Sequence, residues 1–135
     1  IEKKEGRSIS DIFADDGEEY FRNTETEVLK ELMQSEEKKV LALGGGTPLR
    51  EENRAILKKA GYVIFLKITP DEAYKRLKDD TDRPLLQVSN PKEKIAELLA
   101  FRNPIYEAAA DYVLLEDNKS LDDVFYELSE IVRNI

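Results

Sequence analysis

The 135-residue sequence contains no cysteine and no histidine. Without cysteine, the chain has neither a disulfide framework nor a thiolate metal site. Without histidine, it lacks the commonest general base and metal ligand, so its chemistry must use carboxylates, arginines, lysines, hydroxyls or backbone groups. Catalytic triads that depend on histidine are therefore excluded.

Positive charge is also scarce, because 21 lysines and arginines face 29 acids and leave a formal net charge of −8. This charge argues against a broad nucleic-acid or membrane surface, since both partners carry negative charge. No apolar run approaches the roughly 18 residues needed to span a bilayer, and the polar start at residues 1–6 does not resemble a signal peptide. We therefore expect a cytoplasmic protein in which a local arginine pocket binds a small anion.

Apolar segments of helical and strand-like length alternate along the chain, which is typical of an α/β fold. The length suits a single domain over residues 1–135. Strands are expected over three segments: 40–43, 62–66 and 112–115. Helices are expected after Ser8 and over 18–36, 50–60, 70–78, 92–102 with a break or kink at Asn103-Pro104, 105–110, and from Ser120 to the end.

Several helix starts carry local signals. Ser8 with Asp11 and Ser120 with Asp123 are spaced as N-terminal capping pairs, and Gly17 is expected to end the first helix. Thr69 is followed by a first-turn proline and two acids, which suit the positive end of a helix. The last helix places an apolar stripe on one face, which predicts a core contact for Leu121, Val124, Phe125, Leu128, Ile131, Val132 and Ile135.

The expected strand at 40–43 runs directly into Gly44, Gly45 and Gly46. Glycine is favoured where the backbone takes a positive φ or where another group must approach closely. The carboxyl ends of parallel strands are also where open α/β sheets bind ligands. The three glycines therefore indicate a ligand loop, although an ordinary flexible connection between strand and helix stays possible. Their spacing fits neither nucleotide-binding glycine fingerprint.

Arg102 interrupts an apolar helical stripe that includes Ile95, Leu98 and Leu99. A guanidinium at such a position must reach solvent, pair with an acid or bind an anion, because an unpaired buried charge is costly. Its planar fork suits a carboxylate or phosphate. Both an internal ion pair and a ligand contact remain open from the sequence.

The other candidate arginines also have plain alternatives. Arg22 has Glu25 three residues later, as in an ordinary exposed helix pair. Arg76 is compatible with a surface role. Arg83 lies in residues 79–91, a long segment without helical or strand periodicity; we interpret this segment as a lid loop, although Arg83 itself could be a solvated charge.

Five blocks, taken in order, resemble shikimate kinase from end to end: Gly6-Arg7-Ser8-Ile9 with Ile12-Phe13, Glu19-Tyr20-Phe21-Arg22 with Glu25, the three glycines, Arg83-Pro84-Leu85, and Arg102-x-Pro104-x-Tyr106. The resemblance implies a three-layer, parallel-sheet fold of the P-loop kinase type. It also implies ATP-dependent phosphorylation of the 3-hydroxyl of shikimate, a step of aromatic amino-acid biosynthesis, by a monomer.

The resemblance implies a role for each matching residue. Arg22 and Arg102 would hold the shikimate carboxylate, and Glu25 would steady Arg22. Gly44, Gly45 and Gly46 would place backbone amides near the substrate ring, between walls formed by Phe13 and Phe21. Arg83 would be catalytic, closing over the ATP phosphates with the lid, and Arg76 would lie against the adenine.

One family feature is missing, because no part of the 135 residues fits G-x-x-x-x-G-K-[ST], the phosphate-binding loop. We expect this loop, the Mg²⁺ ligands and the first two strands of the family upstream of Ile1, and we expect the isolated chain to be inactive. The phosphate-loop strand would stand between 40–43 and 62–66, so direct pairing of these two segments would indicate a different sheet. Two alternatives stay open: a non-catalytic module of the same fold that binds a small anion or acts as a scaffold, and a kinase for another hydroxy acid such as gluconate.

Overall fold

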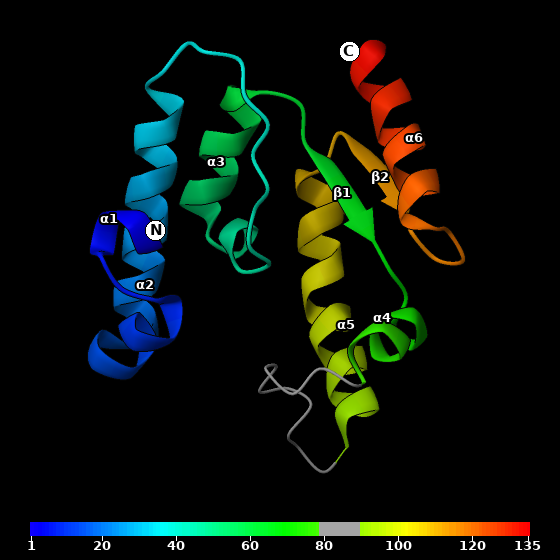
Figure 1. Ribbon diagram of the computed structural model, residues 1–135, viewed down its shortest axis with the longest axis horizontal. Helices are drawn as coiled ribbons and strands as arrows, with labels where there is room; N and C mark the ends of the chain where they lie inside the picture. The colour runs from blue at the N-terminus through cyan, green and yellow to red at the C-terminus, as the bar shows by residue number, and fades with distance from the viewer. Residues whose placement is uncertain (79–89) are drawn as a thin grey trace. The chain divides into compact units, whose positions relative to one another are not determined.

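The computed structural model describes residues 1–78 and 90–135. They form two compact units, Ile1–Gly61 and Tyr62–Ile135, shown in Figure 1. None of the helices within these residues is long and apolar enough to cross a membrane. The first unit contains α1 (Glu2–Glu5), α2 (Ile9–Met33), the 3-10 helix η1 (Thr47–Leu49) and α3 (Glu51–Ala60). The second contains β1 (Ile64–Lys67), α4 (Pro70–Leu77), α5 (Pro91–Ala109), β2 (Tyr112–Leu115) and α6 (Leu121–Arg133).

Helix α2 begins and bends where the sequence predicts. The side chain of Ser8 accepts a hydrogen bond of 3.1 Å from the backbone N–H of Asp11. Gly17, with φ 85° and ψ 175°, then interrupts the helical backbone, so α2 consists of a short and a long helical piece. Glycine is favoured at this φ because it has no Cβ. The predicted separation at Gly17 is therefore confirmed, whereas the short helix α1 was not predicted.

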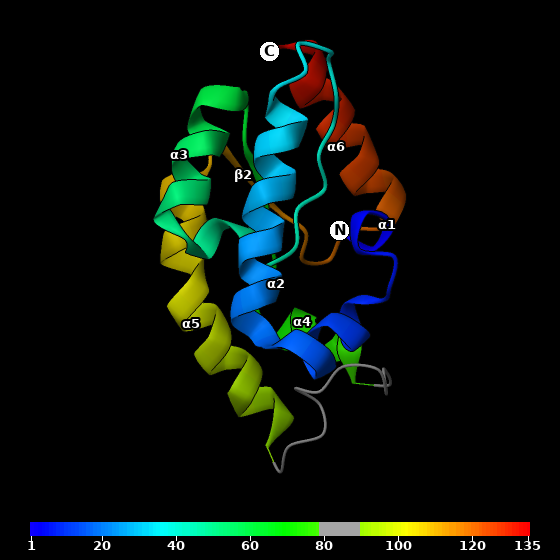
Figure 2. The same ribbon diagram turned by 90° about the vertical axis from the view of Figure 1, so that its left-hand side faces the viewer.

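Helices α2 and α3 pack against each other in the first unit. The segment 34–46 runs back along α2, so that α3 points in the same direction as α2 (Figures 1 and 2). The apolar core of this unit is small and includes Ile12, Phe21, Leu29 and Leu57. The returning segment brings the glycine loop beside the middle of α2.

The prediction of a strand at 40–43 is wrong. These residues have no regular secondary structure, and Val40 is 94% exposed. A strand is stable only when neighbouring strands pair its N–H and C=O groups. In the described part of the chain, β1 pairs only with β2, so residues 40–43 have no strand partner. The direct pairing of 40–43 with 62–66 that would have indicated a different sheet is not present.

The two strands of the second unit confirm the predicted parallel sheet. They pair in parallel, with Ile64 opposite Tyr112 and Lys67 opposite Leu115. Helices α4 and α5 belong to the crossover between them, as parallel pairing requires. Helix α5 packs on β1, where the rings of Phe65 and Tyr106 meet edge to face with centroids 5.0 Å apart.

Of the predicted break or kink at Pro104, the break is wrong, because α5 continues from Pro91 to Ala109. Proline within a helix removes one hydrogen bond and costs about 3 kcal/mol. Packing holds the helix on both sides of this residue: Ile95 is buried, and Tyr106 lies against Phe65. We infer that these contacts offset the cost of the proline.

The predicted caps of α4 and α6 are confirmed. The side chain of Thr69 accepts from the N–H of Glu72, and Ser120 forms a reciprocal capping box with Asp123. The apolar face of α6 is mostly not core, however, because only Val124 is buried and Leu121 is 84% exposed. Of the other predicted residues, Leu128 and Ile131 are half-buried, and Phe125, Val132 and Ile135 are exposed.

Candidate functional site

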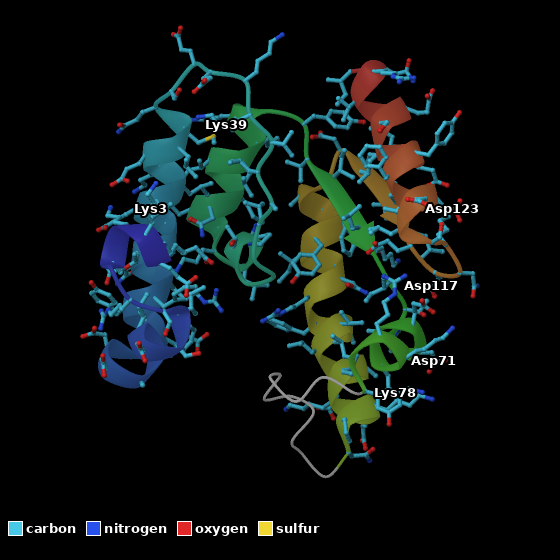
Figure 3. All side chains as sticks on the ribbon, in the orientation of Figure 1. Lys3, Lys39, Asp71, Lys78, Asp117 and Asp123 are labelled. Carbon is cyan, nitrogen blue, oxygen red and sulfur yellow. The ribbon has the colours of Figure 1, made fainter. Side chains whose placement is uncertain are left out.

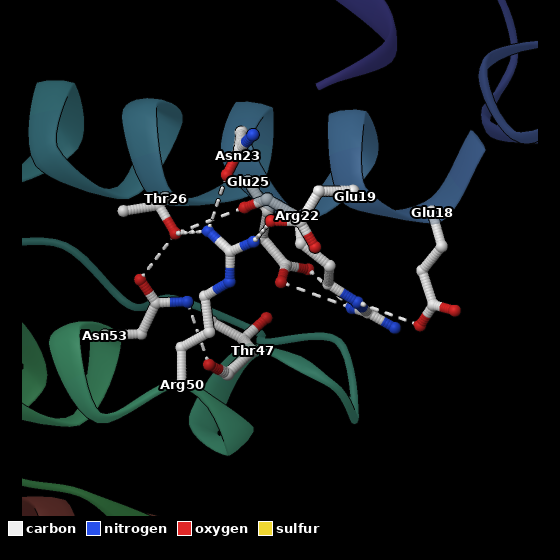
Figure 4. A network of polar contacts seen from close by, with 9 residues as sticks. All are labelled: Glu18, Glu19, Arg22, Asn23, Glu25, Thr26, Thr47, Arg50 and Asn53. Carbon is white, nitrogen blue, oxygen red and sulfur yellow. Dashed lines mark hydrogen bonds and ion pairs between the residues drawn. The ribbon is translucent and has the colours of Figure 1, made fainter. Parts of the chain in front are cut away.

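The first part of the site is a partly buried ion pair on α2. Nη1 of Arg22 lies 3.3 Å from Oε1 and 3.5 Å from Oε2 of Glu25, as Figure 4 shows. Glu25 is only 7% exposed, so its charge needs the partner that Arg22 provides. The more exposed Glu18 lies 3.5 Å from Nε of Arg22. The guanidinium is thereby fixed in direction while its side chain stays partly open to solvent.

The glycine loop lies directly against this ion pair. The carbonyls of Gly44 and Gly46 accept hydrogen bonds from the N–H groups of Thr47 and Leu49, which turns the loop into η1. A Cβ on Gly46 would stand 2.5 Å from Cζ of Arg22, whereas one on Gly44 would lie 3.7 Å from the nearest atom, an ordinary contact. Close approach of Arg22 therefore explains the glycine at position 46. Among the described residues, positive φ at glycine occurs at Gly6 and Gly17 instead.

Two predicted aromatic residues also come together in the first unit. The rings of Phe13 and Phe21 have centroids 4.8 Å apart and are inclined by 38°. Phe21 is buried and also lies beneath the guanidinium of Arg22, 5.1 Å from Cζ to the ring centroid. The short and long pieces of α2 thus contribute one aromatic wall beside Arg22.

An open hollow of about 450 Å³ lies beside Arg22 and Gly46. Its other lining residues are Glu18, Glu19, Leu49 and Arg50. Arg50 was not predicted. Its guanidinium donates to Glu19 at 3.0 Å and to Asn23 at 2.9 Å, so it fastens the start of α3 to the exposed side of α2. Two arginines and two acids thus line the hollow, which is open to solvent.

A buried polar cluster behind the hollow was also missed. Asn53 of α3 is completely buried and bonds to the hydroxyl of Thr26 and to the backbone carbonyl of Thr47 (Figure 4). Asn53 occurs in a polar stretch of sequence, Glu-Glu-Asn-Arg, which is typical of a solvent-exposed helix face. No local signal distinguishes it from its exposed neighbours.

Arg102 lies on α5 in the second unit and is partly buried. Its Nε atom is buried, and it has no hydrogen-bond partner among residues 1–78 and 90–135. A buried donor without a partner is costly. This donor is therefore available to an acceptor such as a ligand carboxylate.

Arg76 belongs to a different cluster of the second unit, between α4 and the loop after β2. It donates to Glu72 and to the backbone carbonyl of Glu116, each at 3.1 Å. In the same loop Asp117 accepts from the hydroxyl of Thr69 at 2.5 Å and from its N–H at 3.0 Å. The hydroxyl of Thr69 lowers the pKa of Asp117 below its ordinary 3.8. Figure 3 shows Asp117 in this loop, near the end of β1.

Arg83 and residues 79–89 of the predicted lid lie outside the described residues. Asn90 and Pro91, the last two residues of that predicted segment, form the start of α5. Within the described ranges, no group of three acids is placed to hold a metal ion. We assign no magnesium ligand to the described residues.

The comparisons with known proteins agree with the residue blocks. The family model for shikimate kinase matches residues 1–133. The chain is 44% identical to the shikimate kinase of Dictyoglomus turgidum, an alignment that covers 99% of this chain and 78% of the relative. It is 41% identical to the shikimate kinase of Thioalkalivibrio sulfidiphilus, covering 98% of this chain and 70% of the relative.

Solved structures agree as well. The shikimate kinase of Acinetobacter baumannii in complex with shikimate matches with a TM-score of 0.82 and 39% identity, covering 98% of this chain and 74% of that one. The shikimate kinase of Aquifex aeolicus matches with a TM-score of 0.75 and 34% identity, covering 98% and 77%. These matches confirm the predicted fold class. The chain therefore belongs to the shikimate kinase family.

Proposed function

We propose that this protein is a shikimate kinase that transfers the γ-phosphoryl group of ATP to the 3-hydroxyl of shikimate. The observation that carries the proposal is the fixed position of Arg22, which Glu25 holds against Gly46 at the edge of the hollow. The match to a solved shikimate kinase bound to shikimate supports the choice of acceptor. The protein is expected to act in the cytoplasm as a monomer.

The acceptor is bound through its carboxylate in this proposal. The guanidinium of Arg22 offers a planar pair of donors, which suits a carboxylate. Arg102 provides the second contact, and its buried Nε without a described partner supports this role. Gly44, Gly45 and Gly46 direct backbone amides toward the ring, and the adjacent rings of Phe13 and Phe21 form the apolar wall.

The transfer step depends on positioning and on charge. Phosphoryl transfer requires little covalent help from the protein, because its transition state is stabilised mainly by alignment and by positive charge near the phosphate oxygens. Arg83 supplies such a charge, and Arg76 lies against the adenine. Magnesium, when bound with ATP, neutralises phosphate charge.

Calorimetric titration of the intact natural protein with shikimate and with gluconate tests the acceptor. Shikimate should bind at least about tenfold more tightly, a difference of about 1.4 kcal/mol. An assay of ATP consumption with each acceptor then tests turnover. Tighter binding of gluconate, with turnover, would indicate a kinase for another hydroxy acid. Binding of shikimate with no transfer would instead support a non-catalytic module.

A further inference from the structure

A single buried amide joins the two sides of the hollow. Asn53 is 0% exposed. Its Nδ2 donates to the carbonyl of Thr47 at 2.9 Å, and its Oδ1 lies 2.9 Å from Oγ1 of Thr26. A backbone carbonyl can only accept, so the NH₂ group must face Thr47 and the amide oxygen must face Thr26. The orientation of the Asn53 side chain is therefore unambiguous.

The orientation of Asn53 also determines the role of the Thr26 hydroxyl. Because the facing amide oxygen only accepts, the hydroxyl must be the donor of the proton in its bond to Asn53. The carbonyl of Arg22, one turn back on α2, lies 3.1 Å from the same hydroxyl and competes for that proton. Nη1 of Arg50 approaches the hydroxyl from the other side at 3.5 Å. The hydroxyl of Thr26 on α2 thus contacts both Asn53 and Arg50, which lie at the start of α3.

The residues at the two ends of this bridge adjoin the substrate-facing groups. Thr26 follows Glu25 directly, and Thr47 follows Gly46 directly. Apolar packing between α2 and α3 is non-directional and tolerates small shifts. Two buried hydrogen bonds with fixed donors and acceptors do not tolerate such shifts. If such a bond is broken, each buried polar group has lost its contact with water without gaining a partner. The bridge therefore fixes how closely the glycine loop lies against Arg22 and Glu25.

We propose that Asn53 is a positioning residue for the acceptor site. It sets the distance between the glycine loop and the Arg22–Glu25 pair, and so the size and shape of the site for the acceptor. With no exposed surface it cannot touch a substrate itself. The inference rests on the proposed function for its consequence in catalysis, but its structural part, the anchoring of residues 44–49, can be measured separately.

Four variants of the intact natural protein test this role. Asn53→Ala removes both bonds, and Thr26→Val removes the hydroxyl at nearly constant shape. Thr26→Ser restores the hydroxyl. Leu57→Ala is the control, because Leu57 is buried one turn further along α3 and takes no part in the bridge. It should lower the melting temperature without altering the KM for shikimate.

Asn53→Ala should raise the KM for shikimate about tenfold or more and leave the KM for ATP within about twofold. Thr26→Val should act in the same direction, and Thr26→Ser should lie near the wild type. An unchanged KM for shikimate in Asn53→Ala, or an equal rise in Leu57→Ala, would overturn the proposal. If Asn53→Ala does not fold, the contrast between Thr26→Val and Thr26→Ser decides, and equal values for those two would overturn it.

Amide hydrogen exchange separates this inference from the proposed function. Asn53→Ala should accelerate exchange at residues 44–49 more than Leu57→Ala does, whether or not the protein phosphorylates shikimate. Faster exchange at residues 44–49 in a protein that neither binds nor phosphorylates shikimate would refute the proposed function alone. Unchanged exchange at residues 44–49 would refute the role of Asn53 alone.

Discussion

The guanidinium of Arg22 occupies the space that a side chain on residue 46 would need, since a Cβ on Gly46 would stand 2.5 Å from Cζ of Arg22. Glycine at this position is therefore a requirement of the arginine's placement rather than of the backbone, whose φ is −85°. The relationship connects the glycine loop with the proposed carboxylate-binding residue.

Gly46→Ala should consequently displace Arg22 and weaken shikimate binding. The guanidinium is the flexible end of its side chain, so the protein should still fold while the dissociation constant for shikimate rises about tenfold or more. Calorimetry measures the change. Gly44→Ala is the matched control, because its Cβ meets only ordinary contacts at 3.7 Å, and it should have a clearly smaller effect. Equal effects of the two variants would contradict the explanation.

Glu25→Gln should loosen Arg22 while preserving the shape of the buried side chain. Loss of the charged partner leaves the guanidinium less well oriented, at a cost of about 1–3 kcal/mol. We expect a lower melting temperature and a KM for shikimate raised about tenfold. Glu18→Gln removes an exposed carboxylate from the same arginine and should change either quantity little. A similar result for both variants would show that Glu25 does not orient Arg22.

The contact between Asp117 and Thr69 predicts a dependence of stability on acid. The hydroxyl of Thr69 lowers the pKa of Asp117 below 3.8 in the folded protein. A depressed folded-state pKa contributes stability above the unfolded-state value, and that stability is lost as the pH falls through the folded-state value. Asp117→Asn should therefore destabilise the protein near pH 6 and reduce the fall in melting temperature below about pH 4.

Melting curves between pH 6 and 2.5 check this prediction, with pH steps chosen to bracket the ordinary carboxyl range near 4. Asp122→Asn makes the same change of net charge on α6 and serves as the control. If both variants lose stability in parallel with the wild type as the pH falls, Asp117 makes no specific contribution.

Arg83→Ala should reduce turnover more than substrate affinity. An arginine that faces the transferring phosphoryl group stabilises charge that develops mainly in the transition state, so we expect kcat to fall about 10²- to 10³-fold. The dissociation constant for shikimate should stay within about twofold. Arg133→Ala removes an exposed arginine of α6 and should leave kcat unchanged. A loss confined to shikimate affinity would instead place Arg83 among the acceptor-binding residues.

Local sequence signals predicted most helix ends and the parallel strands correctly. Ser8, Gly17, Thr69 and Ser120 act through bonds or dihedral angles within a few residues, so their effects can be read from short segments. The prediction of a strand at 40–43 was wrong because a strand also depends on neighbouring strands that pair with it. The prediction of a helix break at Pro104 was wrong for a similar reason, since packing on both sides of this residue maintains α5.

The candidate site shows the same division between local and distant interactions. The Arg22–Glu25 pair was indicated by spacing and by family resemblance. The close approach of Arg22 to Gly46 was not, because the glycines were expected to admit a ligand. Asn53 and Arg50 were not indicated either, because their partners on α2 lie 24 to 31 residues away and their own surroundings in the sequence are polar. Whether Arg22 and Arg102 bind the same group remains a prediction from the family resemblance.

A crystal structure of the intact natural protein with shikimate would show whether Arg22 and Arg102 bind one carboxylate. We predict one shikimate carboxylate within about 3 Å of both the Arg22 and the Arg102 guanidinium groups, with the ring beside residues 44–46. A carboxylate bound by other residues, or Arg22 and Arg102 lining separate cavities, would contradict it.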